Sequence, residues 1–261
     1  MVNLTSPVSW AAKSAPEVNQ IAKQNGSILV VPVGSLEQHG DHLPTGTDTI
    51  LVEHVATRGA EQVADDVPVL LTPTLWAGYS PHHLPFGGTV TSEFDTLHEQ
   101  LEEVAASALE NGFDSLLLVN GHGGNRPLVS AATDTIGQNH PDAEILGLTY
   151  FELAGDTIAE LRESESGGMA HGGELETSML LHLHPELVDE EQLAATPWES
   201  EYEHAPSDLL GSGSLSVTLD VEDWSETGAM GDVSAVSAEK GEQFVTAFVD
   251  EFAALLRTIH E

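Results

Sequence analysis

Short apolar runs alternate with longer amphipathic segments along the first 151 residues, and this alternation constrains the fold more than any other feature. The apolar runs predict strands at residues 27–33, 67–75, 114–120 and 143–151. The segments between them predict helices at residues 49–64, 92–110 and 125–138. Alternating strands and helices are typical of βαβ units with a parallel sheet. The 261 residues therefore fit an α/β fold in one domain, residues 1–261.

The second half of the chain is less regular. Helices are predicted near residues 172–183 and 237–259. The last one carries apolar residues at helical spacing, which favours a core or subunit-contact face over a cofactor site: Phe244, Phe248, Phe252 and Leu255. Residues 194–231 are rich in Pro, Gly and acids, and predict an excursion over one face with two short strands around residues 215–221.

The composition is strongly acidic, with 7 Lys and Arg against 43 Asp and Glu and a formal net charge of −36. Such a surface repels nucleic acid and anionic membranes, so neither is an expected partner. Hydrophobic content of 40% argues against disorder. High salt screens self-repulsion, so we expect a halophilic, archaeon-like source. The alternative is an acidic protein from an ordinary cell.

The sequence contains no Cys, which excludes disulfides, thiolate zinc sites and cysteine nucleophiles. No apolar run approaches the roughly 20 residues of a transmembrane helix. The N-terminal residues lack the charged and apolar regions of a signal peptide. We therefore expect a cytoplasmic protein.

Acids and imidazoles gather directly after the first predicted strand. Glu37, His39 and Asp48 lie within residues 34–48, at the carboxyl end of an apolar run. Ligands bind at this edge of open α/β sheets, and carboxylate with imidazole suits Zn, Mn or Fe(II). A polar turn with solvent-exposed histidines would explain each residue alone, but together they favour a metal site.

A second polar turn, Asn120-Gly-His122-Gly-Gly-Asn125, follows the third predicted strand and precedes a helix. Its glycines allow a sharp turn and close approach to a ligand. A phosphate cradle is the alternative, but the Lys-Ser/Thr of a P-loop is absent. His122 fits a metal ligand better, and Asn125 is placed to cap the next helix.

A third cluster places His171, Glu174 and Glu176 around the start of a predicted helix. Acids there also complement the helix dipole, which is the structural alternative. With His171, they offer a last metal ligand and a proton-transfer group. Residues two apart on a helix point in different directions, so at most one glutamate is a direct ligand.

Five motifs in order give the chain a resemblance to the creatininase-like amidohydrolases: GSLEQHG at 34–40, LPTGTD at 43–48, HLPFGGTV at 83–90, NGHGGN at 120–125 and HGGELETS at 171–178. The resemblance implies a three-layer α/β/α sandwich with a mostly parallel sheet, and one or two divalent ions at its carboxyl edge. It also implies a homohexamer that hydrolyses C–N amide bonds. Carried over, Glu37 and His122 resemble ligands of one metal, His39 a ligand of the other, and Asp48 the bridge.

Departures from the family pattern argue against creatinine as the substrate. Enzymes that open creatinine carry Tyr-Glu where this chain has Gly123 and Gly124, and that Glu binds the second metal. They carry Trp-Asp where this chain has Gly167 and Gly168. We therefore expect a wider and less aromatic pocket.

The same comparison bears on the fifth ligand. The creatinine enzymes have an apolar residue at the position of Glu174 but keep a glutamate at that of Glu176. A carboxylate lost at Gly124 and gained at Glu174 could fill one coordination position. We therefore favour Glu174, with Glu176 as the alternative.

The expected chemistry is attack of a metal-activated water on an amide carbonyl. His171, Glu174 or Glu176 would pass the proton to the leaving nitrogen. Four residues are expected to contact the substrate: Ser80, His83, Gly123 and Arg126.

Three functions compete. The first is an amidohydrolase of a small or cyclic amide. The second keeps this chemistry but deformylates a formylamino-pyrimidine nucleotide, whose phosphate Arg126 would anchor, or trims a precursor peptide. The third is a non-enzymatic metal-binding protein. Metal content, measured together with activity on formyl amides, separates them.

Overall fold

The computed structural model describes residues 4–205, 208–211, 213–218 and 220–261. Four strands form one sheet in the order β2-β1-β3-β4, and every neighbouring pair is parallel. Their bounds are Ile28–Val33 for β1, Val69–Leu71 for β2, Ser115–Asn120 for β3 and Glu144–Thr149 for β4. Val33 pairs with Asn120, and Asn120 with Thr149, so β1, β3 and β4 end level at the carboxyl edge.

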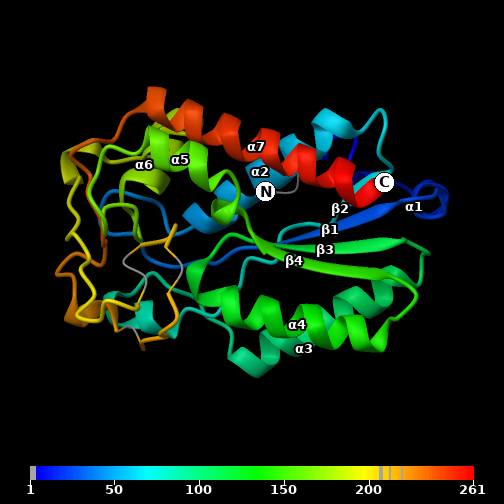
Figure 1. The fold of residues 1–261 in the computed structure, drawn as a ribbon, viewed down its shortest axis with the longest axis horizontal. Coiled ribbons are helices and arrows are strands. Elements are labelled where there is room, and N and C mark those ends of the chain that lie inside the picture. Colours follow the sequence, from blue (N-terminus) through cyan, green and yellow to red (C-terminus); the bar gives the residue numbers. More distant parts are fainter. Residues whose placement is uncertain (1–3, 206–207, 212, 219) are drawn as a thin grey trace.

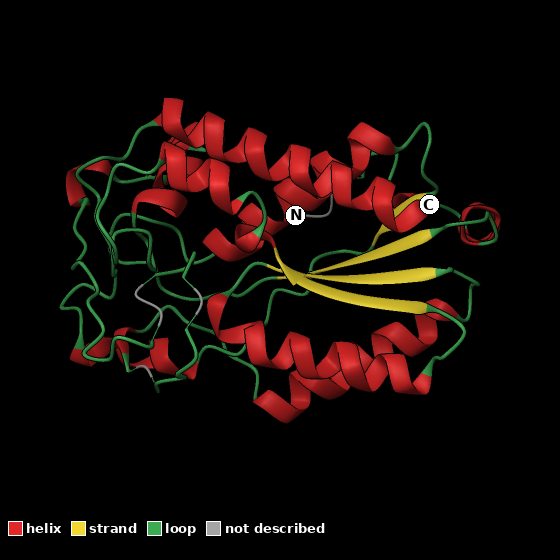
Figure 2. Ribbon diagram, in the orientation of Figure 1, coloured by secondary structure: helices red, strands yellow, loops and turns green. Residues whose placement is uncertain are grey.

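Helices cover both faces of the sheet (Figures 1 and 2). One face is covered by α2 (Thr47–Val63), α5 (Gly155–Leu161), α6 (Glu174–Leu183) and α7 (Ala238–His260). The other face is covered by α3 (Phe94–Leu109) and α4 (Arg126–Asn139). This α/β/α arrangement confirms the predicted fold class.

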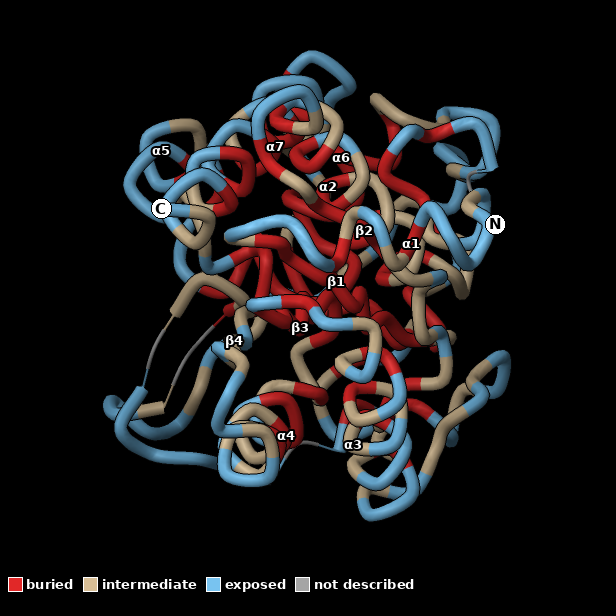
Figure 3. Tube along the Cα trace, turned by 90° about the vertical axis from the view of Figure 1, so that its right-hand side faces the viewer, coloured by how far each residue is buried: buried red, intermediate tan, exposed pale blue. Residues whose placement is uncertain are grey.

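Alternation along the strands explains the two layers. Ile28 and Val30 of β1 join the core beneath α2 and α7, whereas Leu29 and Val31 join the core beneath α3 and α4. Successive side chains of a strand point to opposite faces, so a fully apolar run is required where both faces are covered. Figure 3 shows the resulting band of buried residues between exposed outer helix surfaces.

The long terminal helix α7 supplies much of one core. Phe244, Phe248 and Phe252 are fully buried there, which confirms that these aromatics are core residues. No helix in the described ranges is long and apolar enough to cross a membrane.

Several predicted elements differ from the structure. β2 spans Val69–Leu71 rather than residues 67–75, because Pro73 has no N–H for a ladder, and Leu75 makes only an isolated bridge to Val33. The described residues 215–218 and 220–221 contain no strand.

Helix ends also differ. α3 begins at Phe94, with Glu93 as its N-cap, rather than at residue 92, and two helices were not predicted: α1 (Ala15–Ala22) and α5. α1 and α5 span only eight and seven residues, which is too short for a clear helical periodicity.

Candidate metal centre

The candidate site lies at the carboxyl edge of the sheet, the end of the molecule where the described parts of residues 190–235 also lie (Figure 1, yellow to orange). The loop after β1 carries Glu37 and His39, and the first turn of α2 carries Asp48. The loop after β3 carries His122, and the first turn of α6 carries Glu176. All five side chains are buried. Residues far apart in sequence thus meet because parallel strands end at one edge.

Asp48 stands between the two predicted histidine ligands. Its Oδ1 lies 3.2 Å from His39 Nε2, and its Oδ2 lies 3.1 Å from His122 Nδ1. Glu37 Oε1 also lies 3.1 Å from His122 Nδ1. Each carboxylate oxygen of Asp48 therefore faces a different imidazole, which is the arrangement required of a ligand shared by two ions.

Backbone carbonyls fix the tautomers of both imidazoles. His39 Nδ1 lies 3.1 Å from the carbonyl of Glu37, and His122 Nε2 lies 3.1 Å from the carbonyl of Tyr79. A carbonyl can only accept, so these nitrogens carry the hydrogens. The opposite nitrogens, which face Asp48, are then free to bind a metal, as is usual for histidine ligands.

The buried acceptors fit a cation. Glu37 Oε1 and Asp48 Oδ2 are buried without a hydrogen-bond partner. Buried carboxylate oxygens are costly unless paired, and both face His122. A divalent ion held by Glu37, Asp48 and His122 would satisfy them, and nitrogen with carboxylate suits Zn or Mn.

A second candidate metal position lies on the His39 side of Asp48. Glu176 Oε2 lies 3.8 Å from His39 Nε2, and His39, His171 and Glu176 offer ligand atoms within 4.8 Å of one another. The ring centroids of His39 and His171 are 4.0 Å apart. Glu176 therefore supplies the carboxylate that complements His39.

Glu174 lies outside this cluster, which corrects the preference for it as the fifth ligand and as a proton-transfer group. Its Oε1 accepts from Lys240 Nζ at 2.6 Å, and its carboxylate also accepts from the backbone N–H groups of Glu163 and Ser164. The carboxylate is therefore used to join α6 to α7. Sequence reasoning missed Lys240 because it lies 66 positions away.

The two glutamates should give opposite results on substitution. Glu176→Gln should lower the number of ions bound per chain with little loss of stability. Glu174→Gln should keep the ions but lower the free energy of unfolding by about 2 kcal/mol, because buried Lys240 loses the nearer of its two carboxylate partners and keeps only Glu163. Elemental analysis and urea unfolding measure the two effects. Loss of metal in Glu174→Gln alone would restore the original assignment.

Gly124 explains why the carboxylate has moved. A Cβ at this position would lie 2.4 Å from His122 Nε2 and 2.7 Å from the Tyr79 carbonyl. The contact that orients His122 therefore excludes any side chain at residue 124. A carboxylate for a second ion would therefore have to come from elsewhere, and Glu176 is placed to provide it.

Burial and the neighbouring charges shift the pKa values of the residues in the cluster. Burial lowers the pKa of His39, but Asp48 and Glu176 outweigh this and raise it to about 9. Burial also opposes charge on His122, whose pKa Glu37 and Asp48 nevertheless raise well above its usual value. Burial raises the pKa of Glu176 to about 7. Protons hold these groups together without metal, so metal binding must release them.

Ser80 holds ligands rather than lining the cavity, which corrects its predicted role. It is fully buried, and its Oγ donates to Glu37 Oε2 at 2.5 Å. Ser35 Oγ lies 2.6 Å behind it, and His122 Nε2 lies 3.1 Å from it. This chain of hydroxyls orients Glu37 so that Oε1 faces the cluster.

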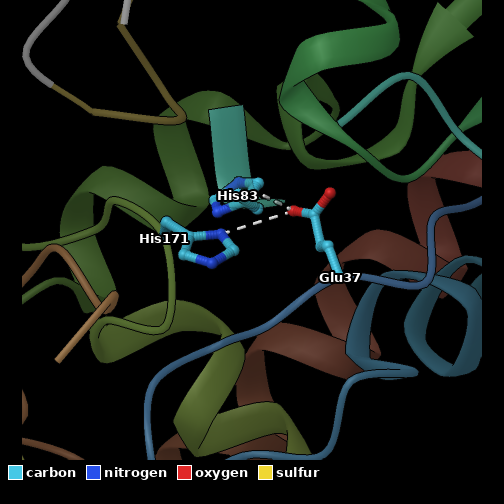
Figure 4. A group of neighbouring side chains, drawn as sticks. All are labelled: Glu37, His83 and His171. Carbon is cyan, nitrogen blue, oxygen red and sulfur yellow. Dashed lines mark ion pairs between the residues drawn. The ribbon is translucent and has the colours of Figure 1, made fainter. Parts of the chain in front are cut away.

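A cavity of 650 Å³ opens over the cluster and is lined by Asp48, His83, His122, His171 and Glu176. Figure 4 shows His83 and His171 turned toward Glu37; the distances to Glu37 Oε1 are 3.3 Å from His83 Nε2 and 3.5 Å from His171 Nδ1. Burial, together with His39 and His83, lowers the pKa of His171 well below its usual value.

The cavity continues outward. A second cavity of 510 Å³ shares Gly123, Arg126 and Trp198 with the first. Trp198 lines the site because Gly167 has no side chain: a Cβ there would lie 2.0 Å from the Trp198 carbonyl oxygen. An aromatic wall therefore comes from another segment, although residues 123 and 167 carry no side chains.

Arg126 lines both cavities, but its charge is compensated. Its Nε lies 2.9 Å from Glu152, and its guanidinium donates to the Leu209 carbonyl. The guanidinium also lies 4.9 Å over the Phe151 ring.

Asn125 is the N-cap residue of α4 but makes no side-chain cap. It accepts from Tyr79 N–H and donates to the Gly34 carbonyl, so it joins two loops of the site.

The chain matches the family model described as creatininase, creatinine amidohydrolase, over residues 11–256. It is 32% identical to the 3-dehydro-scyllo-inosose hydrolase of Thermotoga maritima over 90% of this chain and 78% of that protein. It is 34% identical to the mycofactocin precursor peptide peptidase of Mycobacterium tuberculosis, over 85% and 82% respectively. Among solved structures, a mutant creatininase of Zn-Zn type has a TM-score of 0.80 at 25% identity, covering 96% of this chain and 97% of that one.

Proposed function

This chain belongs to the creatininase family and is a metal-dependent amidohydrolase, and we propose that it cleaves a C–N amide bond in a substrate more extended than creatinine. The observation that carries the proposal is the convergence of two imidazoles on the two oxygens of Asp48. The relatives that support it include a hydrolase and a peptidase as well as creatinine amidohydrolase.

The residue roles follow from the contacts. Glu37, Asp48 and His122 would hold one ion, and His39, Asp48 and Glu176 the other. When bound, such ions polarise an amide carbonyl and lower the pKa of water. His171 faces the same cavity with an unprotonated nitrogen, so it can take a proton from water and return it to the leaving nitrogen.

The substrate class follows from the two joined cavities. The outer one is lined by Trp198, Tyr202 and Trp224, with the acids Glu152 and Glu201. Aromatic walls favour an apolar or aromatic group, and the negative charge of Glu201 disfavours a phosphate. We therefore favour a peptide-like amide with an uncharged aromatic end. The nucleotide alternative is weakened because Arg126 is already paired with Glu152.

Three substrates test this proposal: a blocked peptide amide with aromatic residues, a formylamino-pyrimidine nucleotide and creatinine. We expect turnover of the first and negligible turnover of creatinine. Trp198→Ala should raise KM for the aromatic amide about 10-fold, at little cost in kcat, because remote apolar contact is lost. Leu187→Ala is the control, since Leu187 is 42% exposed and lies outside both cavities. Efficient creatinine hydrolysis would overturn the substrate class.

A non-enzymatic metal-binding role is the remaining alternative. It predicts a full complement of metal without turnover of any amide. The 650 Å³ cavity over the cluster favours an enzyme, because a storage or structural site needs no space beside its ligands.

Three finer properties complete the proposal. A homohexamer is supported by large exposed apolar side chains on the segment around β2 and the following loop: Trp76, Leu84 and Val90. A halophilic source and a cytoplasmic location are supported by the net charge of −36, which suits a salt-rich cytosol.

A further inference from the structure

Gln38 separates the two metal-ligand candidates Glu37 and His39 in sequence, and its side chain is buried beside the cluster. Its amide orientation is fixed by the backbone. The Oε1 atom accepts from Gly40 N–H at 2.9 Å, and Nε2 donates to the Gly228 carbonyl at 3.0 Å. An N–H can meet only the oxygen end, and a carbonyl only the nitrogen end. The reversed orientation would break both contacts.

This orientation determines the tautomer of His83. Gln38 Nε2 lies 2.7 Å from His83 Nδ1. An amide nitrogen only donates, so Nδ1 must accept and the ring hydrogen must lie on Nε2. That Nε2 lies 3.3 Å from Glu37 Oε1, on the side of the ring that faces the cluster.

The main chain of the same residue determines the tautomer of His171, which also carries its hydrogen on Nε2 but has its unprotonated Nδ1 nearest Glu37. His171 Nε2 donates to the Gln38 carbonyl at 2.6 Å. The unprotonated Nδ1 then lies 3.5 Å from Glu37 Oε1. The two rings stack with centroids 4.2 Å apart, so a donor and an acceptor stand side by side in the cavity.

We propose that Gln38 is a positioning residue that makes His83 a hydrogen-bond donor and His171 a proton acceptor toward the substrate. Glu37, His83 and His171 are close enough to resemble a third metal position. The hydrogen on His83 Nε2 excludes that ring as a ligand, because the nitrogen facing Glu37 has no free lone pair. His83 instead donates to an oxygen of the substrate.

Gly228, in the segment over the cavity, packs against the Gln38 side chain. Gly228 has φ of +88°, and a Cβ there would lie 2.1 Å from Gln38 Oε1. Only glycine adopts this conformation readily and also leaves room for the amide. The segment over the cavity therefore packs directly on the residue that sets both tautomers.

The Gln38 side chain sets the tautomer of His83 and the Gln38 carbonyl sets that of His171, so substitutions of the side chain test the two roles separately. In histidine-labelled, zinc-loaded protein, long-range proton–nitrogen correlation spectra distinguish protonated from unprotonated ring nitrogens. In Gln38→Glu the new carboxylate accepts rather than donates, so His83 should move its hydrogen to Nδ1. His171 should keep its tautomer, because the carbonyl of residue 38 is unchanged. In Gln38→Ala only His83 should lose its preference.

The kinetic consequence rests on the proposed function. Gln38→Glu should lower kcat for the amide substrate about 100-fold with KM within 2-fold and metal content unchanged, as expected for lost proton or hydrogen-bond transfer. Gln100→Glu, at an exposed position of α3, is the charge-matched control and should match wild type.

Two results would overturn the proposal: an unchanged His83 tautomer in both variants, or a His171 tautomer that changes together with it. If no amide is hydrolysed by the wild type, the hydrolase proposal fails, while the spectra still decide the role of Gln38.

Discussion

Replacing Asp48 with alanine should remove both metal ions and lower hydrolytic kcat by on the order of 10³-fold. Asp48 presents one oxygen to each imidazole, so its loss opens both positions at once. The remaining ligands would be split between Glu37 with His122 and His39 with Glu176. Two protein ligands rarely retain zinc against a chelating resin, because stable sites use three or four.

Elemental analysis after dialysis over such a resin measures the metal. Asp41→Ala is the matched control, because Asp41 carries the same charge in the loop that leads into α2 but is exposed. Asp48→Asn keeps the size of the side chain and tests whether a loss reflects folding instead. An Asp48→Ala protein with full metal content would disprove the bridging assignment.

The melting temperature of the metal-loaded protein should rise steeply with KCl, by roughly 10 °C or more between 0.01 M and molar salt. A net charge of −36 repels itself over a Debye length of about 30 Å at 0.01 M, but only about 3 Å at 1 M. Acids crowd single surfaces, as on α3, where Asp95, Glu99 and Glu103 are all exposed.

Sucrose at matched osmolality controls for solute exclusion, since it stabilises without screening charge. A melting temperature that does not change with KCl concentration would reject the halophilic source while leaving the enzymatic proposal intact. Equal stabilisation by sucrose would show that screening is not the cause.

The position of the site was predictable from sequence because it depends on strand order and burial. Residues 28–33 and 116–119 are continuous apolar runs, so their ends had to lie at one edge of a covered parallel sheet. Glu37, Asp48 and His122 come after these strands in the sequence, so they could be predicted to meet at that edge. The buried face of the last helix was also predictable, because its apolar residues recur at helical spacing. Phe248, which is fully buried, is an example.

The choice between Glu174 and Glu176 was not predictable in this way. It depends on the rotation of α6 about its axis, which the preceding glycines leave free. Lys240 on α7 fixes that rotation through a contact with no local sequence pattern. Ser80 was misassigned for a similar reason, since its neighbours Ser35 and Glu37 come from a different loop.

Gly124 also limits the paths by which this active site can change over generations. A glutamate introduced there by mutation would collide with His122 as it is now placed. It becomes tolerable only after His122 moves, and that movement would itself disrupt the existing site. The two ligand arrangements are therefore separated by intermediates that lack a working centre. We expect lineages with a glycine at this position to retain it, and to diversify instead through the loop that carries Trp198.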